Sequence, residues 1–133
     1  FEGVVTAAVY PVADARTGDQ VMAALQLREG AEFDPRGFAE FLEAQSDLGT
    51  KWAPRFVRIV RAMPLTGTGK LDKRPLRTER WSTADPVWWR PQTRRAGTGS
   101  AGYEYRLMGP EDVEELRREF ESNGRAALLD LPA

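Results

Sequence analysis

The chain has 133 residues, enough for one domain, and its content of 41% hydrophobic and 29% charged residues is ordinary for a folded soluble domain. Its formal net charge of −1 provides no global field that would recruit nucleic acid or anionic lipid. The absence of Cys excludes a disulfide framework and thiolate metal sites. The absence of His removes the usual zinc ligand and the usual acid–base group near neutral pH. We therefore expect no metal site within this chain.

No apolar run approaches the about 20 residues that a membrane span needs, and no basic region precedes an apolar one as in a signal peptide. The chain begins at Phe1 and enters a strand-like run at once, which indicates a fragment of a longer polypeptide. We expect a cytoplasmic protein. Peripheral association with a membrane stays open if the substrate is a lipid.

Two apolar runs near the start predict an antiparallel hairpin. Residues 4–12 are rich in Val and Ala and contain Pro11 near their end, while residues 20–27 form a second run of strand length. The Asp and Gly residues of 13–19 are typical of the turn between them. The Ala and Met content of the second run also allows a helix.

A helix is predicted to begin at Asp34, because Asp is a good N-cap and Pro35 suits the first helical position. Phe33 and Phe38 are spaced for a hydrophobic staple across this start. The helix is expected to end near residues 47–49, where Asp and Gly occur.

Residues 55–60 alternate in polarity and are rich in β-branched side chains, which predicts a third strand. Asp72 is expected to cap a short helix that runs to about residue 80. Trp-rich residues 82–92 and a linker over 93–102 follow. Residues 103–107 allow a short strand. Pro110 and Gly124 then bracket a final helix over 110–123.

The stretch PLTGTGKLDK, residues 64–73, places a lysine directly behind a Thr-Gly-Thr-Gly run. Glycines let a backbone approach a ligand closely, and Lys supplies a compact charge with three donors, so the loop is a candidate anion-handling site. The plainer interpretation is a surface connection with a solvated charge. The candidate residues are Thr66, Gly67, Thr68, Gly69 and Lys70.

A phosphate-binding P-loop is excluded as an explanation of this stretch. That motif would need Gly at the position of Pro64 and Ser or Thr at the position of Leu71. The spacing G-x-G-x-x-G is also absent, because Asp72 stands where the third Gly would be.

The sequence RFVRIVRAMPLTGTGKLDKRPLR, residues 55–77, resembles the last motif of the adenylate-forming superfamily, which includes acyl-CoA synthetases, luciferases and the adenylation domains of peptide synthetases. The order of the hairpin, helix, strand and Gly-Lys loop agrees with the family's small C-terminal domain over about residues 4–81. TGTGK and DPVWW are similar to the long-chain and very-long-chain fatty acyl-CoA synthetase branch. The residues in register with the motif are Pro64, Thr66, Gly69, Lys70, Lys73 and Leu76.

The resemblance implies an α+β fold for residues 1–81, with a small three-stranded, mainly antiparallel sheet and helices packed on it. Residues 82–133 would form a Trp-rich extension ending in a helix. The large N-terminal domain that binds ATP and the acyl group in this family is absent from this chain.

The resemblance also implies the C-terminal domain of an ATP-dependent fatty acyl-CoA ligase, with Lys70 as the catalytic lysine of acyl-adenylate formation. The domain would then rotate for thioester formation with coenzyme A. Lys73 would support the loop or contact a phosphate. ATP, Mg²⁺ and coenzyme A would bind mainly with the chain's own large domain, and the fragment alone would be inactive. The other partner would be a fatty acid or another lipophilic carboxylic acid.

Two other functions are compatible with the sequence. A free-standing interaction module could dock a partner through the helix at 110–123. A nucleic-acid binder could use the interleaved basic and Trp residues of 55–95, although the neutral total charge and the acidic segment 111–121 count against it. Arg55 and Arg58 are expected on a solvated or inter-domain face. Three tryptophans are expected to serve packing: Trp81, Trp88 and Trp89.

Overall fold

The computed structural model describes residues 3–16, 18–44, 54–90 and 105–130. The predicted end of the first helix near 47–49 and the predicted linker over 93–102 lie outside these residues. The elements, in chain order, are β1 (Val4–Ala13), β2 (Asp19–Leu27), α1 (Pro35–Glu43), β3 (Phe56–Val60), α2 (Arg74–Glu79), β4 (Val87–Trp89), β5 (Arg106–Leu107), α3 (Pro110–Ser122) and the 3₁₀ helix η2 (Ala126–Asp130).

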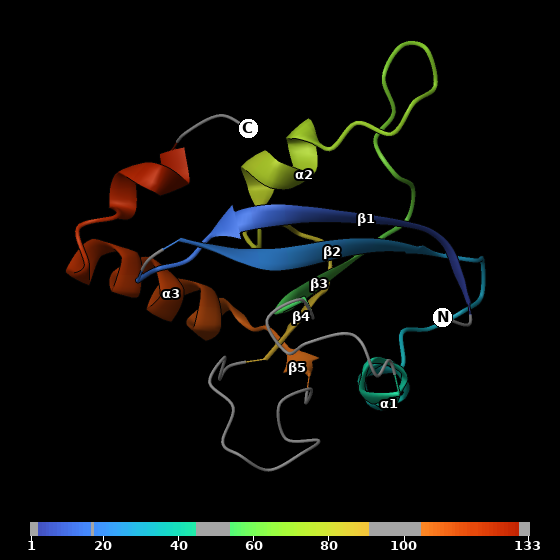
Figure 1. The fold of residues 1–133 in the computed structure, drawn as a ribbon, viewed down its shortest axis with the longest axis horizontal. Helices are drawn as coiled ribbons and strands as arrows, with labels where there is room; N and C mark the ends of the chain where they lie inside the picture. Colours follow the sequence, from blue (N-terminus) through green and yellow to red (C-terminus); the bar gives the residue numbers. More distant parts are fainter. Residues whose placement is uncertain (1–2, 17, 45–53, 91–104, 131–133) are drawn as a thin grey trace.

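One mixed sheet of five strands, in the order β1-β2-β3-β4-β5, organises these elements (Figure 1). The β1–β2 pair is antiparallel, which confirms the predicted hairpin, and β3 runs parallel to β2. The remaining pairs, β3–β4 and β4–β5, are antiparallel. The chain between β2 and β3 contains α1, and this crossover makes the parallel pairing possible.

The prediction of a three-stranded sheet is wrong, because β4 and β5 add two strands. Trp88 pairs with Val57 of β3 on one side and with Leu107 of β5 on the other. The assignment of the Trp pair to an extension outside the sheet is therefore wrong as well. The structure confirms the end of the short strand allowed at 103–107, which is β5 at Arg106–Leu107. The three residues of β4 are too short a run to give an alternation signal in the sequence.

The larger hydrophobic core lies on the face of the sheet that carries α2 and α3 (Figure 1). Alternation along β1 turns Ala8 and Tyr10 into this core, while Val9 between them is exposed. Phe56 and Phe120, among the largest fully buried side chains, join β3 and α3 through it. Residues on both sides of position 81 thus share one core, and the division into domains at that position stays a prediction.

The second core lies between the other face of the sheet and α1. Helix α1 begins at Pro35 as predicted, and the Phe33 and Phe38 rings lie 5.5 Å apart across its start. The Asp34 side chain makes no capping hydrogen bond. Helix α3 begins at Pro110, and Gly124 follows it with φ +69°, as the predicted boundaries require.

Candidate functional site

The Gly-Lys loop between β3 and α2 is a small hairpin that projects from the body of the domain (Figure 1). Leu65 and Leu71 form an isolated antiparallel bridge at its neck. The Asp72 amide donates to the Pro64 carbonyl at 2.9 Å, and closes the base of the loop. Backbone bonds therefore define this loop, although its composition alone suggests a flexible connection.

The tip of the loop is a tight turn. The Gly69 amide donates to the Thr66 carbonyl at 2.9 Å, and the Thr66 amide donates to the Lys70 carbonyl at 2.7 Å. The Thr66 hydroxyl accepts a bond from the Lys70 amide at 3.1 Å and lies 3.1 Å from the Thr68 hydroxyl. Gly69 has φ +85°, a conformation that favours glycine.

Lys70 lies at this tip and is exposed, as are its neighbours Gly67, Thr68 and Gly69, while Thr66 is half-buried. Within the part of the chain that the structure describes, no carboxylate pairs with the Lys70 ammonium. The tip thus presents one positive charge to solvent, on a backbone that is held at its neck.

Lys73 lies at the start of α2 and serves a different contact. Its ammonium donates to the carbonyl of Val9 on β1 at 3.0 Å. This bond ties the residue that follows the loop to the sheet. Of the two roles expected for Lys73, support of the loop is the one that its present contact can provide.

Asp72 and Arg74 form an exposed ion pair at the same helix start, 2.9 Å apart. The prediction that Asp72 caps α2 is wrong by one residue, because the N-cap is Lys73. The Asp72 carboxylate nevertheless accepts the amide of Arg74, the first residue of the helix, at 3.1 Å. The side-chain bond from Arg74 lowers the pKa of Asp72 below its ordinary value of 3.8. Arg74 thus neutralises the charge of Asp72, the carboxylate two residues after Lys70.

The expectation that Arg55 and Arg58 lie on a solvated face is wrong, because both are buried. The Arg55 guanidinium stacks 5.1 Å from the Trp89 ring centroid and donates to the Arg90 carbonyl at 3.0 Å. Burial lowers its pKa. Its guanidinium also lies 3.9 Å from the carboxylate of Asp14, just after β1. Arg55 thus joins the turn after β1 to β4, a strand that the sequence pattern does not reveal.

Arg58 connects β3 to two later segments of the chain. Its guanidinium pairs with Glu79 at the end of α2 at 2.7 Å, and with Asp85 at 2.8 Å. The buried hydroxyl of Tyr10 has no hydrogen-bond partner among the described residues, and burial raises its pKa above the ordinary value of 10.0. The pair of Arg58 and Glu79 fixes the end of α2, the helix that follows the Lys70 loop, against the sheet.

Among the described residues, no group of three His, Cys, Asp or Glu side chains could hold a metal ion. None of the helices in the described ranges is both long enough and apolar enough to cross a membrane.

Comparison with known proteins shows relatives among acyl-CoA synthetases. The chain is 45% identical over 126 residues to a steroid-22-oyl-CoA synthetase of Rhodococcus jostii, a match that covers 95% of this chain and 21% of that protein. It is 52% identical over 81 residues to a medium/long-chain-fatty-acid–CoA ligase of Mycobacterium tuberculosis, with 61% of this chain and 16% of that protein covered. The chain thus spans about a fifth or less of the length of these relatives.

Solved structures of adenylate-forming enzymes resemble the fold. The amide bond synthetase McbA from Marinactinospora thermotolerans matches with a TM-score of 0.52 and 37% identity, over 59% of this chain and 16% of that one. The structure of apo MatB from Rhodopseudomonas palustris matches with a TM-score of 0.55 and 31% identity, over 62% of this chain and 16% of that one. The family model described as AMP-binding enzyme C-terminal domain matches residues 1–70 and ends on Lys70. The chain belongs to the family of C-terminal domains of AMP-binding enzymes.

Proposed function

We propose that this chain is the C-terminal domain of an ATP-dependent acyl-CoA ligase, and that Lys70 is its catalytic lysine. One observation carries the proposal. The Lys70 ammonium is exposed at the tip of a projecting loop whose neck is fixed by backbone bonds, and no carboxylate of the described residues pairs with it. Such a charge can enter a pocket formed by another domain without first breaking an ion pair.

In the proposed first half-reaction, a carboxylate oxygen of the acid attacks the α-phosphorus of ATP. The new P–O bond forms as the bond to pyrophosphate breaks, which gives acyl-adenylate. Both reactants are anions, so a cation between them offsets their repulsion and stabilises the charge that develops on the α-phosphate. A preorganised charge or donor of this kind is worth about 10²–10³ in rate.

In the proposed second half-reaction, the thiolate of coenzyme A attacks the acyl carbonyl, and AMP leaves with the electrons of the broken C–O bond. Lys70 has no role in this step, because the domain rotates and withdraws the loop. Thr66, Gly67, Thr68 and Gly69 shape the tip and let the lysine project. Lys73 supports the loop or contacts a phosphate.

We assign ATP and coenzyme A mainly to the large N-terminal domain. Residues 1–81 are the proposed mobile domain of the family, and 82–133 are a branch-specific part that shares its core. Mg²⁺ bound with ATP would neutralise phosphate charge. The described residues contain no cluster that could hold this ion, so we derive no step of this chain through it. The proposed enzyme is cytoplasmic, with peripheral membrane contact open for a lipid acid.

Two classes of acid are candidates. The fatty-acid assignment is supported by similarity to a medium/long-chain-fatty-acid–CoA ligase, which covers 61% of this chain. The steroid-22-oyl-CoA synthetase covers 95%, so its likeness continues through most of residues 82–133. This longer match favours a steroid side-chain acid as the second candidate.

The test is pyrophosphate release by the full-length enzyme with ATP, coenzyme A and a panel of acids. The panel pairs medium- and long-chain fatty acids with a steroid that carries a side-chain carboxylate. We expect release that depends on one of these classes. If no acid elicits pyrophosphate release, the ligase assignment is contradicted and the free-standing interaction module, without catalysis, is favoured.

A further inference from the structure

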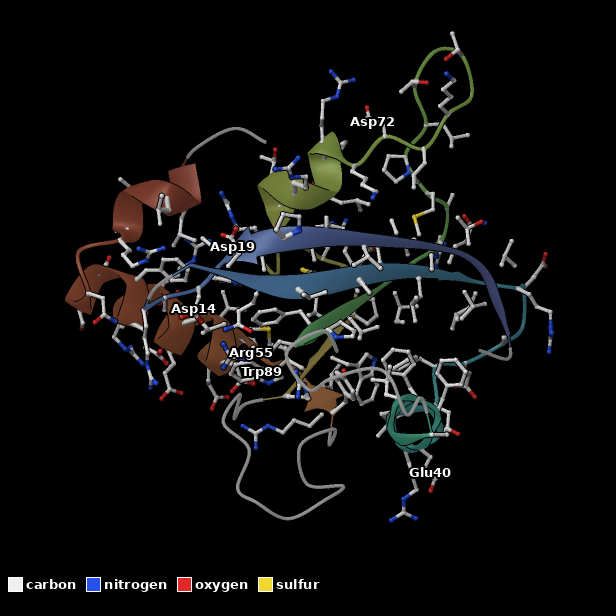
Figure 2. The ribbon with its side chains drawn as sticks, in the orientation of Figure 1. Asp14, Asp19, Glu40, Arg55, Asp72 and Trp89 are labelled. Atoms are coloured by element: carbon white, nitrogen blue, oxygen red, sulfur yellow. The ribbon has the colours of Figure 1, made fainter. Side chains whose placement is uncertain are left out.

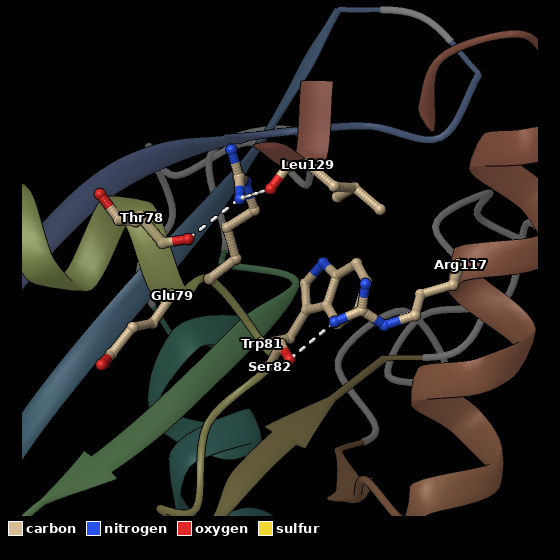
Figure 3. Close-up of a pocket in the computed structure, with 7 residues that line it drawn as sticks. Thr78, Glu79, Trp81, Ser82, Arg117 and Leu129 are labelled. Atoms are coloured by element: carbon tan, nitrogen blue, oxygen red, sulfur yellow. Dashed lines mark hydrogen bonds between the residues drawn. The ribbon is translucent and has the colours of Figure 1, made fainter. Parts of the chain in front are cut away.

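The Lys70 loop has an incoming arm, which leaves β3 at Val60, and an outgoing arm, which runs into α2. Helix α2 is held at its start by the bond of Lys73 to β1. Its end is held by Arg80, which donates to the Leu129 carbonyl at 3.0 Å (Figure 3). The incoming arm is joined to no helix, so a different contact must set its direction.

A glutamine of β2 provides this contact. The Met63 amide donates to Oε1 of Gln26 at 3.0 Å, and among the residues that the structure describes neither group has another hydrogen bond. Gln26 is the last residue of β2 that pairs with β3, where it lies opposite Val60. Its side chain therefore continues the bonding between the two strands beyond the point where their backbones separate.

Gln26 departs from the apolar pattern of its strand. Alternate residues of β2 turn toward the larger core, and the two that precede Gln26 on this face, Met22 and Ala24, are fully buried and apolar. Gln26 is half-buried and brings an amide group to the edge of this core. Burial of a polar group costs free energy unless it is hydrogen-bonded, so the bond to Met63 is what makes a glutamine favourable here.

Met63 transmits this contact to the neck of the loop. Its side chain is 7% exposed and packs in the larger core, so the residue is fixed by its side chain as well as by its amide. The next residue, Pro64, has a fixed φ and accepts the Asp72 amide that closes the loop. Gln26 thus holds one arm of the loop and Lys73 the other, and both contacts come from the β1–β2 hairpin.

We propose that Gln26 is a positioning residue for acyl-adenylate formation, because its bond to Met63 sets the direction in which the loop carries Lys70. This inference rests on the proposed ligase function, in which the Lys70 charge must lie between two anions. Gln26 itself does not contact the reactants. Loss of its acceptor frees the incoming arm to tilt, which slows adenylation and leaves thioester formation, where Lys70 has no role, unchanged.

The test compares Gln26→Met with Gln20→Met in the full-length enzyme. Gln20 is also half-buried but lies at the opposite end of β2, where its Nε2 donates to Asp14 at 3.0 Å. Each substitution therefore removes one side-chain hydrogen bond from the same strand. Gln26→Met should lower the rate of pyrophosphate release in adenylation by about two- to tenfold, the effect of one lost hydrogen bond. AMP release from preformed acyl-adenylate and coenzyme A should not change, and Gln20→Met should change neither rate.

Two further measurements separate positioning from general stability. Gln26→Glu keeps an acceptor on a side chain of the same length and should retain most of the adenylation rate. Hydrogen–deuterium exchange of the Met63 amide, resolved by electron-transfer fragmentation, reports the contact without any need for activity. This amide should be protected in the unmodified enzyme and in Gln20→Met, and should exchange at least tenfold faster in Gln26→Met.

Unchanged adenylation in Gln26→Met overturns the proposal, as does an equal loss in both half-reactions or an equal loss of adenylation in Gln26→Met and Gln26→Glu. An unprotected Met63 amide in the unmodified enzyme also overturns it, whether or not the variants fold. If the unmodified enzyme releases no pyrophosphate with any acid, the ligase assignment fails instead. Faster exchange confined to Gln26→Met then still supports Gln26 as the anchor of the loop, and equal exchange in the two Met variants overturns that as well.

Discussion

The Lys73 ammonium donates a hydrogen bond to the carbonyl of Val9, 3.0 Å away, and so joins the start of α2 to the edge strand β1. The two residues are 64 positions apart, and no local pattern relates them. Lys70 lies three residues before this anchor, at the tip of the loop that leads into α2 (Figure 2 shows α2 beside β1). Motion of the helix start would therefore be passed to the loop.

Lys73→Met should lower the adenylation rate of the full-length enzyme by about two- to tenfold, because loss of one hydrogen bond costs about 0.5–1.5 kcal/mol. The KM for ATP should not change, since the ammonium is engaged by Val9. Arg77→Met, which removes an exposed charge from the same helix, is the matched control. A rise in the KM for ATP without a change in rate would assign Lys73 to phosphate contact instead.

Gly69 and Gly67 provide a matched pair in the loop. An added Cβ meets nothing within 4 Å at either position, but only Gly69 has a positive φ, +85°. Gly69→Ala should therefore destabilise the folded loop by about 1–2 kcal/mol through backbone strain alone, while Gly67→Ala should be close to neutral. Urea unfolding and the adenylation rate of the full-length enzyme measure both effects. Equal effects of the two substitutions would contradict this account of the turn.

Arg58→Ala should destabilise the chain by about 1.5–3 kcal/mol, because it removes the hydrogen bonds of a buried guanidinium to two partly exposed carboxylates. Glu79 and Asp85 lie 2.7 and 2.8 Å from the guanidinium, whose side chain is 9% exposed. The control is Arg61→Ala, which removes an exposed arginine just beyond β3. Urea denaturation monitored by tryptophan fluorescence gives the difference, and a loss similar to that of Arg61→Ala would show that the network contributes little.

Tyr10 should make the fold less stable at alkaline pH. Burial raises the pKa of its hydroxyl in the folded state above the ordinary value of 10.0. The stability that this group contributes is complete below pH 10 and is lost as the pH rises from there toward the folded-state pKa, because the unfolded chain ionises first. The free energy of unfolding should fall between pH 8 and pH 11, and this fall should be smaller in Tyr10→Phe than in the unmodified chain. An identical fall in both would exclude this contribution.

Features that depend on local chemistry could be predicted from the sequence. Pro35 and Pro110 mark the starts of α1 and α3, because proline suits the first helical turn and these positions need no amide donor. The hairpin follows from two apolar runs around a turn with Asp and Gly.

Features that depend on distant partners could not be predicted. The residues of β4 become a strand only because β3 and β5 flank them. Arg58 is buried only because Asp85, 27 residues later, returns to it. The Lys70 loop could be predicted in part. Its glycines indicate a projecting loop, but the bonds that hold its neck, such as that from Asp72 to Pro64, come from the structure.

The proposed charge of Lys70 acts in one half-reaction only. Lys70→Ala in the full-length enzyme should lower acyl-adenylate formation from acid and ATP by about 10²–10³-fold. The same variant should convert preformed acyl-adenylate and coenzyme A to thioester at close to the unmodified rate. The two half-reactions can be measured separately by pyrophosphate release and by AMP release. A comparable loss in both would contradict the claim that Lys70 is an adenylation-specific charge.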